Sequence, residues 1–209
     1  MRRRHPEATV IVMVRAPLAG RTKTRLARGV GAVSAARLYR AVAGGVIRRL
    51  ACQRWRLVLT FAPDGAVASR WFGGSSAARH GQGRGDLGSR MARAMRDAGD
   101  GPVLVVGSDL PELGASDIAA ALKALRTAPV VVGPSPDGGY WLIGFGRRKP
   151  FHGLFRNVRW SGPHALADTL ASLPAGCGVA RLHVQADLDE PADLAAFGGV
   201  NALGYRCRR

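Results

Sequence analysis

Cysteine is scarce in this chain of 209 residues. Its three cysteines, Cys52, Cys177 and Cys207, are odd in number and far apart, and no pair has the short spacing of metal ligands. This pattern argues against a disulfide framework or a cysteine metal site, and we expect ordinary reduced thiols.

The chain also lacks a long apolar run. None of its hydrophobic stretches approaches the roughly 18 residues that a helix needs to span a bilayer. The basic residues 1–6 are followed by only a short apolar run, without a secretory core or a small-residue cleavage site. We therefore expect a cytoplasmic protein.

Acidic residues are few, and so are lysines and aromatics. Against 14 acidic residues stand 31 basic ones, of which only three are lysine, and the net charge is +17. The charge is spread along the chain, with small clusters at residues 2–4 and 206–209, and aromatics make up 6%. Nucleic-acid binders usually concentrate charge on one face and add stacking aromatics. A phosphorylated small molecule therefore fits this composition at least as well as DNA.

What the chain does have is a succession of apolar strands and amphipathic helices, which predicts an α/β fold. Its length suits one domain with a sizeable core. Strands are expected at residues 8–14, 55–61, 103–106, 129–134, 140–144 and 179–184. Helices are expected at residues 34–50, 87–98, 116–126 and 164–173, with a short one through residue 71.

The stretch from Val103 to Pro111 organises the rest. Four apolar residues predict a strand buried on both faces, and Asp109 follows its carboxyl end. In open α/β sheets, ligands bind outside the carboxyl ends of the strands. Asp109 is therefore placed to hold a metal ion or a ribose hydroxyl, although turn aspartates that cap a helix are also common.

A basic loop follows the first expected strand. It holds Arg15, Arg21, Lys23 and Arg25 together with Gly20. Backbone N–H groups and fixed cations after a strand are typical of a phosphate site. The loop is not a Walker A motif, because Thr22 rather than glycine precedes Lys23, and a solvated basic loop is the alternative.

A second loop, residues 82–88, contains three glycines. These allow the backbone to approach a flat ligand closely. Asp86 in the same loop has a simpler explanation, because it can cap the helix that begins at Leu87.

Five of the few carboxylates fall in loops at the ends of expected strands or in the hairpin turn: Asp86, Asp109, Asp137, Asp187 and Asp189. Two aspartates at the ends of neighbouring strands form an oxygen site for Mg²⁺ or Mn²⁺, which also takes phosphates and water. With cations opposite, such a site suits a nucleoside di- or triphosphate. The default for Asp137 is a tight hairpin turn with Gly138 and Gly139.

Several motifs together resemble one family in order and spacing. The chain resembles the bacterial GT-A-type transferases often labelled arsenosugar-biosynthesis-type glycosyltransferases, formerly a domain of unknown function. It is more distantly similar to 2-phospho-L-lactate guanylyltransferase and the molybdenum cofactor guanylyltransferases. The motifs are Arg15-x-Pro17-x-x-Gly20-x-x-Lys23-Thr24-Arg25-Leu26, Gly85-Asp86-Leu87-Gly88-x-Arg90-Met91, Gly107-Ser108-Asp109-Leu110-Pro111, Asp137-Gly138-Gly139-Tyr140, Trp160-Ser161 and Asp187-x-Asp189-x-Pro191-x-Asp193-Leu194.

The resemblance covers about residues 8–197. It implies a single-domain GT-A (nucleotide-diphospho-sugar transferase) fold over that range, a mostly parallel central sheet with helices on both faces. Residues 1–7 and 198–209 would then be basic tails. Gly162 stands after Trp160-Ser161 where the family pattern has threonine.

The resemblance also implies roles for individual residues. The metal, Mg²⁺ or Mn²⁺, would be held by Asp109 and Asp189. Asp137 and Lys23 would be catalytic, with Asp137 as the base. The nucleotide would be bound by Arg15, Gly20, Lys23, Arg25, Gln82, Gly85, Asp86, Leu87, Gly88 and Ser108.

Two reactions agree with this pattern. The first is glycosyl transfer from a nucleotide-diphospho-sugar to a small-molecule acceptor. The second is nucleotidyl transfer of the guanylyltransferase type, from an NTP to a phosphorylated acid with release of pyrophosphate. A non-enzymatic polyanion binder ranks well below both, because it leaves the aspartates at the strand ends unexplained.

Overall fold

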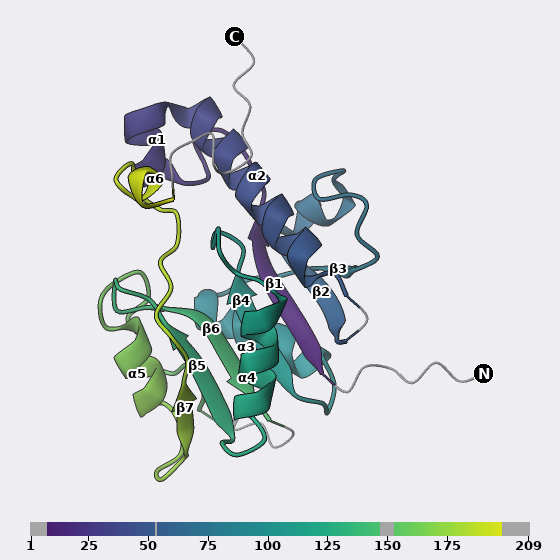
Figure 1. Cartoon of the computed structure of the whole chain (residues 1–209), viewed down its shortest axis with the longest axis vertical. Coiled ribbons are helices and arrows are strands. Elements are labelled where there is room, and N and C mark those ends of the chain that lie inside the picture. Colours follow the sequence, from purple (N-terminus) through teal and green to yellow (C-terminus); the bar gives the residue numbers. More distant parts are fainter. Residues whose placement is uncertain (1–7, 53, 147–152, 198–209) are drawn as a thin grey trace, which may run out of the picture.

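The computed structural model describes residues 8–52, 54–146 and 153–197, so the expected basic tails lie outside the described residues. Seven strands form one sheet in the order β3-β2-β1-β4-β6-β5-β7 (Figure 1). Strands β1 to β4 are mutually parallel, β6 is antiparallel to its neighbours β4 and β5, and β7 is parallel to β5. The strands are β1 (Thr9–Arg15), β2 (Arg56–Ala62), β3 (Ala78–Gly81), β4 (Val103–Gly107), β5 (Val130–Pro134), β6 (Tyr140–Phe145) and β7 (Val179–Arg181).

Helices cover both faces of the sheet. One apolar cluster includes Val10 and Val12 of β1 with Leu38 and Val46 of α2, and the other includes Ile11 of β1. Adjacent β1 residues thus point into different cores, as the alternation of a strand requires. The helices are α1 (Thr24–Val30), α2 (Ala32–Leu50), the 3₁₀ helix η1 (Asp64–Ala68), α3 (Leu87–Asp97), α4 (Ala115–Ala124), α5 (Ala165–Ala171) and α6 (Asp193–Ala196).

The fold expected from the sequence is confirmed: an α/β structure with a mostly parallel sheet. The hairpin turn expected around Asp137 is also confirmed, because residues 135–139 connect the antiparallel strands β5 and β6. Helix α1 and the edge strand β3 were not expected. The short helix expected through residue 71 was wrong in extent, because the 3₁₀ helix η1 ends at Ala68. The last strand was predicted too long, since β7 ends at Arg181 and the chain continues to Asp189 without regular structure.

This topology brings distant segments to one edge of the sheet. The carboxyl ends of β1, β3, β4, β5 and β7 lie there, together with the start of β6. The chain after β7 then runs up to α6, which lies beside α1 (Figure 1). Gly29 of α1 lies so close to Pro191 that a Cβ there would stand 2.6 Å from its ring. The late aspartates are thereby carried to the basic first loop.

No single helix among the described segments is both long and apolar enough to cross a membrane. Only α1 and α2 taken together reach that length and composition, and they meet at a bend of 120°.

Candidate functional site

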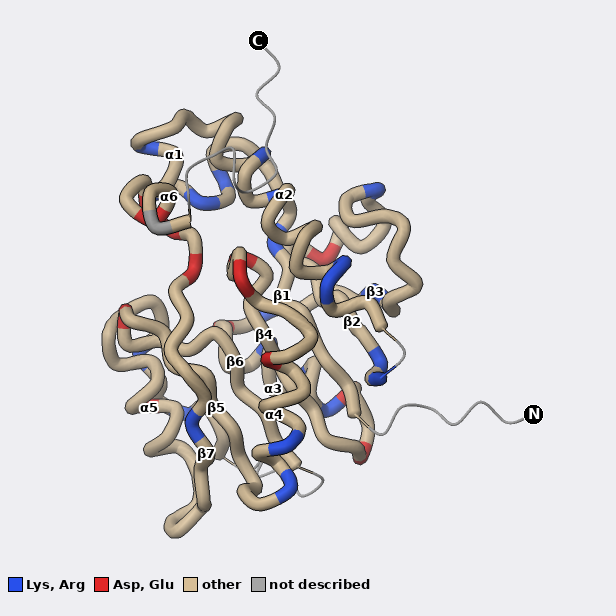
Figure 2. The backbone as a smooth tube through the Cα atoms, viewed as in Figure 1, with Lys and Arg blue, Asp and Glu red and all other residues tan. Residues whose placement is uncertain are grey.

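A cavity of about 530 Å³ opens at the carboxyl edge of the sheet. In Figure 2, acidic positions (red) lie on the loop after β4 and on the segment leading to α6, and basic positions (blue) lie on α1 and α2. The loops after β1 and β4, the turn between β5 and β6 and the segment after β7 all contribute to its wall. Its charged lining residues are Arg15, Arg21, Lys23, Arg25, Arg90, Asp109, Asp137, Asp187 and Asp189.

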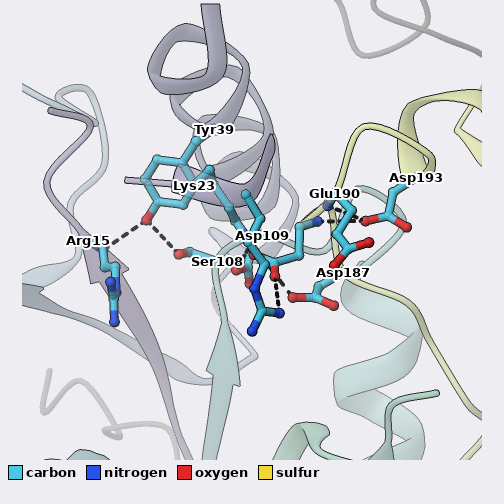
Figure 3. A network of polar contacts seen from close by, with 10 residues as sticks. Arg15, Lys23, Tyr39, Ser108, Asp109, Asp187, Glu190 and Asp193 are labelled. Carbon is cyan, nitrogen blue, oxygen red and sulfur yellow. Dashed lines mark hydrogen bonds and ion pairs between the residues drawn. The ribbon is translucent and has the colours of Figure 1, made fainter. Parts of the chain in front are cut away.

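Lys23 lies at the centre of three carboxylates (Figure 3). Its Nζ lies 2.6 Å from Asp109 Oδ2, 3.3 Å from Asp189 Oδ1 and 3.7 Å from Asp187 Oδ2. The Lys23 side chain is only 8% exposed. On the outer side, Arg25 Nη1 lies 3.0 Å from Asp189 Oδ2. The first loop and the segment after β7 are therefore joined through their charges.

The local backbone explains why Lys23 points inward. The Thr22 hydroxyl donates to the carbonyl oxygen of Ala16 at 2.6 Å and closes the loop after β1. Lys23 then adopts the left-handed conformation, with φ 52°, and α1 begins at the next residue. A non-glycine residue in this conformation is uncommon, so the turn fixes the direction of this side chain at some conformational cost.

The cluster shifts the pKa values of its members. Burial alone would lower the pKa of the Lys23 ammonium, but the charges of Asp109, Asp187 and Asp189 outweigh burial and raise its pKa above the ordinary value. Burial, together with the charge of Asp109, raises the pKa of Asp187 to about 6. Lys23 and Arg25 supply two positive charges against three carboxylates, and the negative charge that remains favours a further cation.

The donor set fits a divalent ion in part. Carboxylate oxygens are the ligands of hard cations such as Mg²⁺, which usually keeps water and takes substrate phosphates as well. Within the described ranges, no group of three or more histidine, cysteine, aspartate or glutamate side chains is arranged as a complete metal site. The Lys23 ammonium instead takes the central position among these oxygens, as a built-in cation.

Tyr39 fixes the floor of the site from α2. Its hydroxyl accepts a hydrogen bond from the Arg15 backbone N–H at 2.8 Å and lies 2.8 Å from Ser108 Oγ (Figure 3). The ring is buried, and burial raises the pKa of the Tyr39 hydroxyl to about 12. This one side chain therefore ties the end of β1, where the basic loop starts, to the end of β4, where Asp109 follows.

Nine of the thirteen residues expected in the site line the cavity. Of these, Gln82 has a structural role too, because its amide nitrogen donates to the carbonyl oxygens of Val14 and Thr60. Asp137 accepts a hydrogen bond from the Gly139 backbone N–H at 2.9 Å. The nine are Arg15, Lys23, Arg25, Gln82, Leu87, Ser108, Asp109, Asp137 and Asp189.

The other four expected residues, three glycines and Asp86, are not among the lining residues: Gly20, Gly85, Asp86 and Gly88. Asp86 accepts the Ser89 backbone N–H at 2.8 Å and caps α3. A Cβ at Gly88 would stand 2.6 Å from Phe155 Cβ and 2.7 Å from the Trp160 ring, so this glycine permits close packing. Part of the glycine-rich loop thus has a structural explanation.

Sequence reasoning did not place Asp187 and Tyr39 in the site. Asp187 was noted only as a loop carboxylate, and Tyr39 lies on the buried stripe of a helix, where it is indistinguishable from a core residue. Arg21 and Arg90, which also line the cavity, belong to the motifs already identified.

Known structures share this fold. A protein from Desulfovibrio desulfuricans G20, whose name proposes a nucleotide-diphospho-sugar transferase, is 29% identical over 88% of this chain and 83% of its own, with a TM-score of 0.75. Rv0371c from Mycobacterium tuberculosis H37Rv, solved in complex with manganese, is 16% identical, covers 90% and 96%, and has a TM-score of 0.56. CMP:2-keto-3-deoxy-manno-octonic acid synthetase, complexed with CTP, is 16% identical, covers 90% and 95%, and has a TM-score of 0.52. The last two show the fold alone.

A comparison with curated proteins finds no match. The family described as an uncharacterized protein conserved in bacteria (DUF2064) matches residues 46–162, more than half of the chain. Together with the Desulfovibrio structure, this match confirms the resemblance seen in the motifs. The chain belongs to the DUF2064 family and has the nucleotide-diphospho-sugar transferase fold.

Proposed function

We propose that this protein is a metal-dependent transferase that uses a nucleotide-activated donor, and that it transfers a glycosyl group from a nucleotide-diphospho-sugar. The main support for this proposal is the Lys23 cluster, in which three carboxylates surround one ammonium in the same cavity as four arginines. Cations for phosphate oxygens and carboxylates for a divalent ion are the two requirements of a metal-bound nucleoside diphosphate.

Each charged residue of the cavity has a proposed role that follows from its position. Arg15, Arg21 and Arg25 on the first loop would hold the diphosphate, and Asp109 and Asp189 would hold Mg²⁺ or Mn²⁺. Bound there, the ion would neutralise charge that builds up on the leaving diphosphate. Lys23 would exchange its carboxylate partners for phosphate oxygens when the donor binds.

Asp137 is the proposed base. It is exposed at the turn between β5 and β6 and lines the same cavity. In the transfer, an acceptor hydroxyl oxygen bonds to the anomeric carbon, the bond from that carbon to the diphosphate oxygen breaks, and the hydroxyl proton passes to Asp137. The diphosphate leaves with the electron pair.

Nucleotidyl transfer is the second candidate. The observation in its favour is the number of cations on the first loop, which suits a triphosphate better than a diphosphate. The likeness to the CTP-bound synthetase supports only the fold for this reaction.

A thermal-shift screen tests the proposal. The protein is melted with a panel of NTPs and nucleotide sugars, each with and without Mg²⁺ or Mn²⁺. A donor at about 100 times its Kd adds about 2.7 kcal/mol to the free energy of unfolding, or about 5–10 °C for a chain of this size. A metal-dependent rise with one nucleotide sugar supports glycosyl transfer, and a rise with an NTP alone supports nucleotidyl transfer.

The matched variants are Asp109→Asn and Asp100→Asn. Asp100 is exposed and precedes β4 at the opposite edge of the sheet. The metal-dependent rise should be lost in the first and kept in the second. If no nucleotide raises the melting temperature of the wild type, the proposed function is wrong.

A further inference from the structure

A second, smaller cavity of about 210 Å³ lies beside the first. The two share Asp109, Asp137 and Asp187 in their walls, so they are compartments of one site. Leu87, which is 42% exposed, lines both. The proposed base therefore faces two compartments, of which the donor phosphates would occupy the larger.

The charges of the two compartments differ. The larger one is lined by Arg15, Arg21, Lys23, Arg25 and Arg90. Among the described residues that line the smaller one, there is no lysine, arginine or histidine, although the protein carries a net charge of +17. Its described lining residues thus offer no cation to pair with a phosphate or carboxylate group. Of its three carboxylates, Asp109 and Asp187 already contact Lys23, which lines the larger compartment.

The walls of the smaller cavity are aromatic. Tyr140, Trp141 and Trp160 all line it. The Trp141 indole donates to the backbone carbonyl oxygen of His183 at 3.1 Å, and Trp160 Nε1 lies 3.3 Å from Asp86 Oδ2. Their indole nitrogens are thus engaged. Trp141 is buried, with 3% of its surface exposed, so the half-buried Tyr140 and Trp160 supply most of the ring surface that a ligand can reach. Aromatic rings bind apolar faces by burial and cations by their negative π faces.

The loop that carries Trp160 is anchored on both sides. The Trp160 ring packs edge-on against the Phe155 ring, with the two ring centroids 5.8 Å apart. The Phe155 backbone N–H donates to Ser172 Oγ at 3.0 Å. The Arg159 guanidinium makes a bidentate contact with the Asp168 carboxylate of α5, with N–O distances of 2.8 and 2.9 Å. The aromatic wall is therefore held in place before any ligand arrives, which lowers the entropic cost of binding.

From this arrangement we infer that the smaller cavity binds the acceptor, and that the acceptor is an uncharged or cationic alcohol rather than a phosphorylated or carboxylated one. Its hydroxyl faces Asp137 and its apolar or cationic part lies against the aromatic wall. This inference rests on the proposed function, because it assigns the second substrate of that site. It also favours glycosyl transfer over nucleotidyl transfer of the guanylyltransferase type, since that reaction has a phosphorylated acid as its acceptor.

Matched pairs of small alcohols test the inference. Glucose and glucose 6-phosphate, glycerol and glycerol 3-phosphate, and choline and phosphocholine are titrated against the protein while tryptophan fluorescence is recorded. The titrations are run both without nucleotide and with the nucleotide that stabilises the protein most. At least one unphosphorylated member should bind about tenfold or more tightly than its phosphate ester, because a charge a few ångströms from a carboxylate is repelled.

Two variants locate the binding. In Trp160→Phe the aromatic wall remains, but the fluorescence change should shrink, and the part that remains should come from Trp141, the other tryptophan of the wall. Gly162→Lys places a cation in the wall, where a Cβ would meet no atom within 4 Å. This variant should narrow or reverse the preference for the unphosphorylated member.

The outcomes are separable from those of the nucleotide screen. If the phosphate esters bind more tightly, or if no unphosphorylated alcohol changes the fluorescence with or without nucleotide, the acceptor inference is wrong. If nucleotides fail to stabilise the protein while the alcohols bind as expected, the proposed function fails and the chemical preference of the cavity stands.

Discussion

Lys23 gives the site a cation of its own. Its ammonium is 2.6 Å from Asp109 and is also within 3.7 Å of Asp187 and Asp189. Without it, three carboxylates would face one another across a partly buried space, which is costly because like charges repel and water is limited there. A divalent ion and Lys23 therefore satisfy the same electrostatic demand.

The variant Lys23→Met tests that reading. Its free energy of unfolding should fall by about 2–3 kcal/mol, between the values for surface and buried ion pairs. Mn²⁺ without nucleotide should then raise the melting temperature of the variant more than that of the wild type. Lys123→Met, at an exposed position of α4, is the control. Equal melting temperatures and equal responses to Mn²⁺ in Lys23→Met and the wild type would refute this role.

Tyr39 is a positioning residue, since it acts through Arg15 and Ser108. Tyr39→Phe removes the hydroxyl and leaves the Arg15 backbone N–H without its acceptor, which should lower the free energy of unfolding by about 1–3 kcal/mol. Tyr140→Phe should cost less, because its hydroxyl has one long contact, 3.4 Å from Thr169 Oγ1. Chemical denaturation gives the two costs. Nucleotide titration of Tyr39→Phe should show weaker affinity with unchanged metal dependence, and unchanged affinity would contradict the positioning role.

Part of the site was predictable residue by residue. Asp109, Asp189 and Lys23 were singled out because they stand at strand ends or in a basic loop, and the structure brings them within contact distance. Asp187 has no predicted role, because the resemblance implies one for Asp189 alone and spacing does not show that both aspartates of this segment turn inward. Tyr39 could not be assigned, because a buried tyrosine on an apolar helix face gives no signal of its hydroxyl's partners.

At the scale of elements, the start of α3 connects the two compartments. Asp86 caps the helix through Ser89 and also receives the Trp160 indole N–H. Leu87 follows at the shared rim of both cavities. A change at this helix end should therefore reach the acceptor wall as well as helix stability.

The variants Asp86→Ala and Asp97→Ala separate these effects at the two ends of α3. Loss of the cap should cost about 1 kcal/mol, whereas Asp97 lies at the helix C-terminus, where a negative charge is unfavourable, so its loss should cost nothing.

Hydrogen bonds from Ser89 hold the pKa of Asp86 below its usual value. The stability from Asp86 is thus complete above its unfolded pKa and is lost as pH falls through the lower folded value. Thermal melts of wild type and Asp86→Ala should converge toward acid pH, and a constant gap would contradict the account.

Elements with a clear apolar pattern were found, and those without one were not. Strands β1, β4 and β5 are rich in valine and are buried along most of their length. The edge strand β3, Ala-Arg-His-Gly, alternates only between exposed and half-buried positions, so hydrophobicity gives no signal. Helix α1 contains a single buried residue, Leu26, and its first turns read as part of the basic loop. Contacts with distant segments decide both elements.

At the scale of the whole molecule, the net charge of +17 predicts weak binding to long polyanions. That binding should fall by about 10³ or more between about 50 and 200 mM salt and should need no divalent ion. Nucleotide binding at the cavity should fall less and should need the metal. Fluorescence anisotropy with single-stranded DNA and with a labelled nucleotide, each at several salt concentrations, compares them. DNA binding that is metal-dependent and lost in Asp109→Asn would instead favour a nucleic-acid function.

The carboxylates around Lys23 are expected to hold a divalent ion together with a nucleotide, and every proposed role in the site depends on this. Manganese binding, followed by electron paramagnetic resonance of free Mn²⁺, measures this directly. With the stabilising nucleotide present, wild type and Asp100→Asn should bind one Mn²⁺ with similar affinity. Asp109→Asn and Asp189→Asn should bind it at least about tenfold more weakly, since each loses one charged ligand. Equal Mn²⁺ affinity in all four proteins would contradict the account.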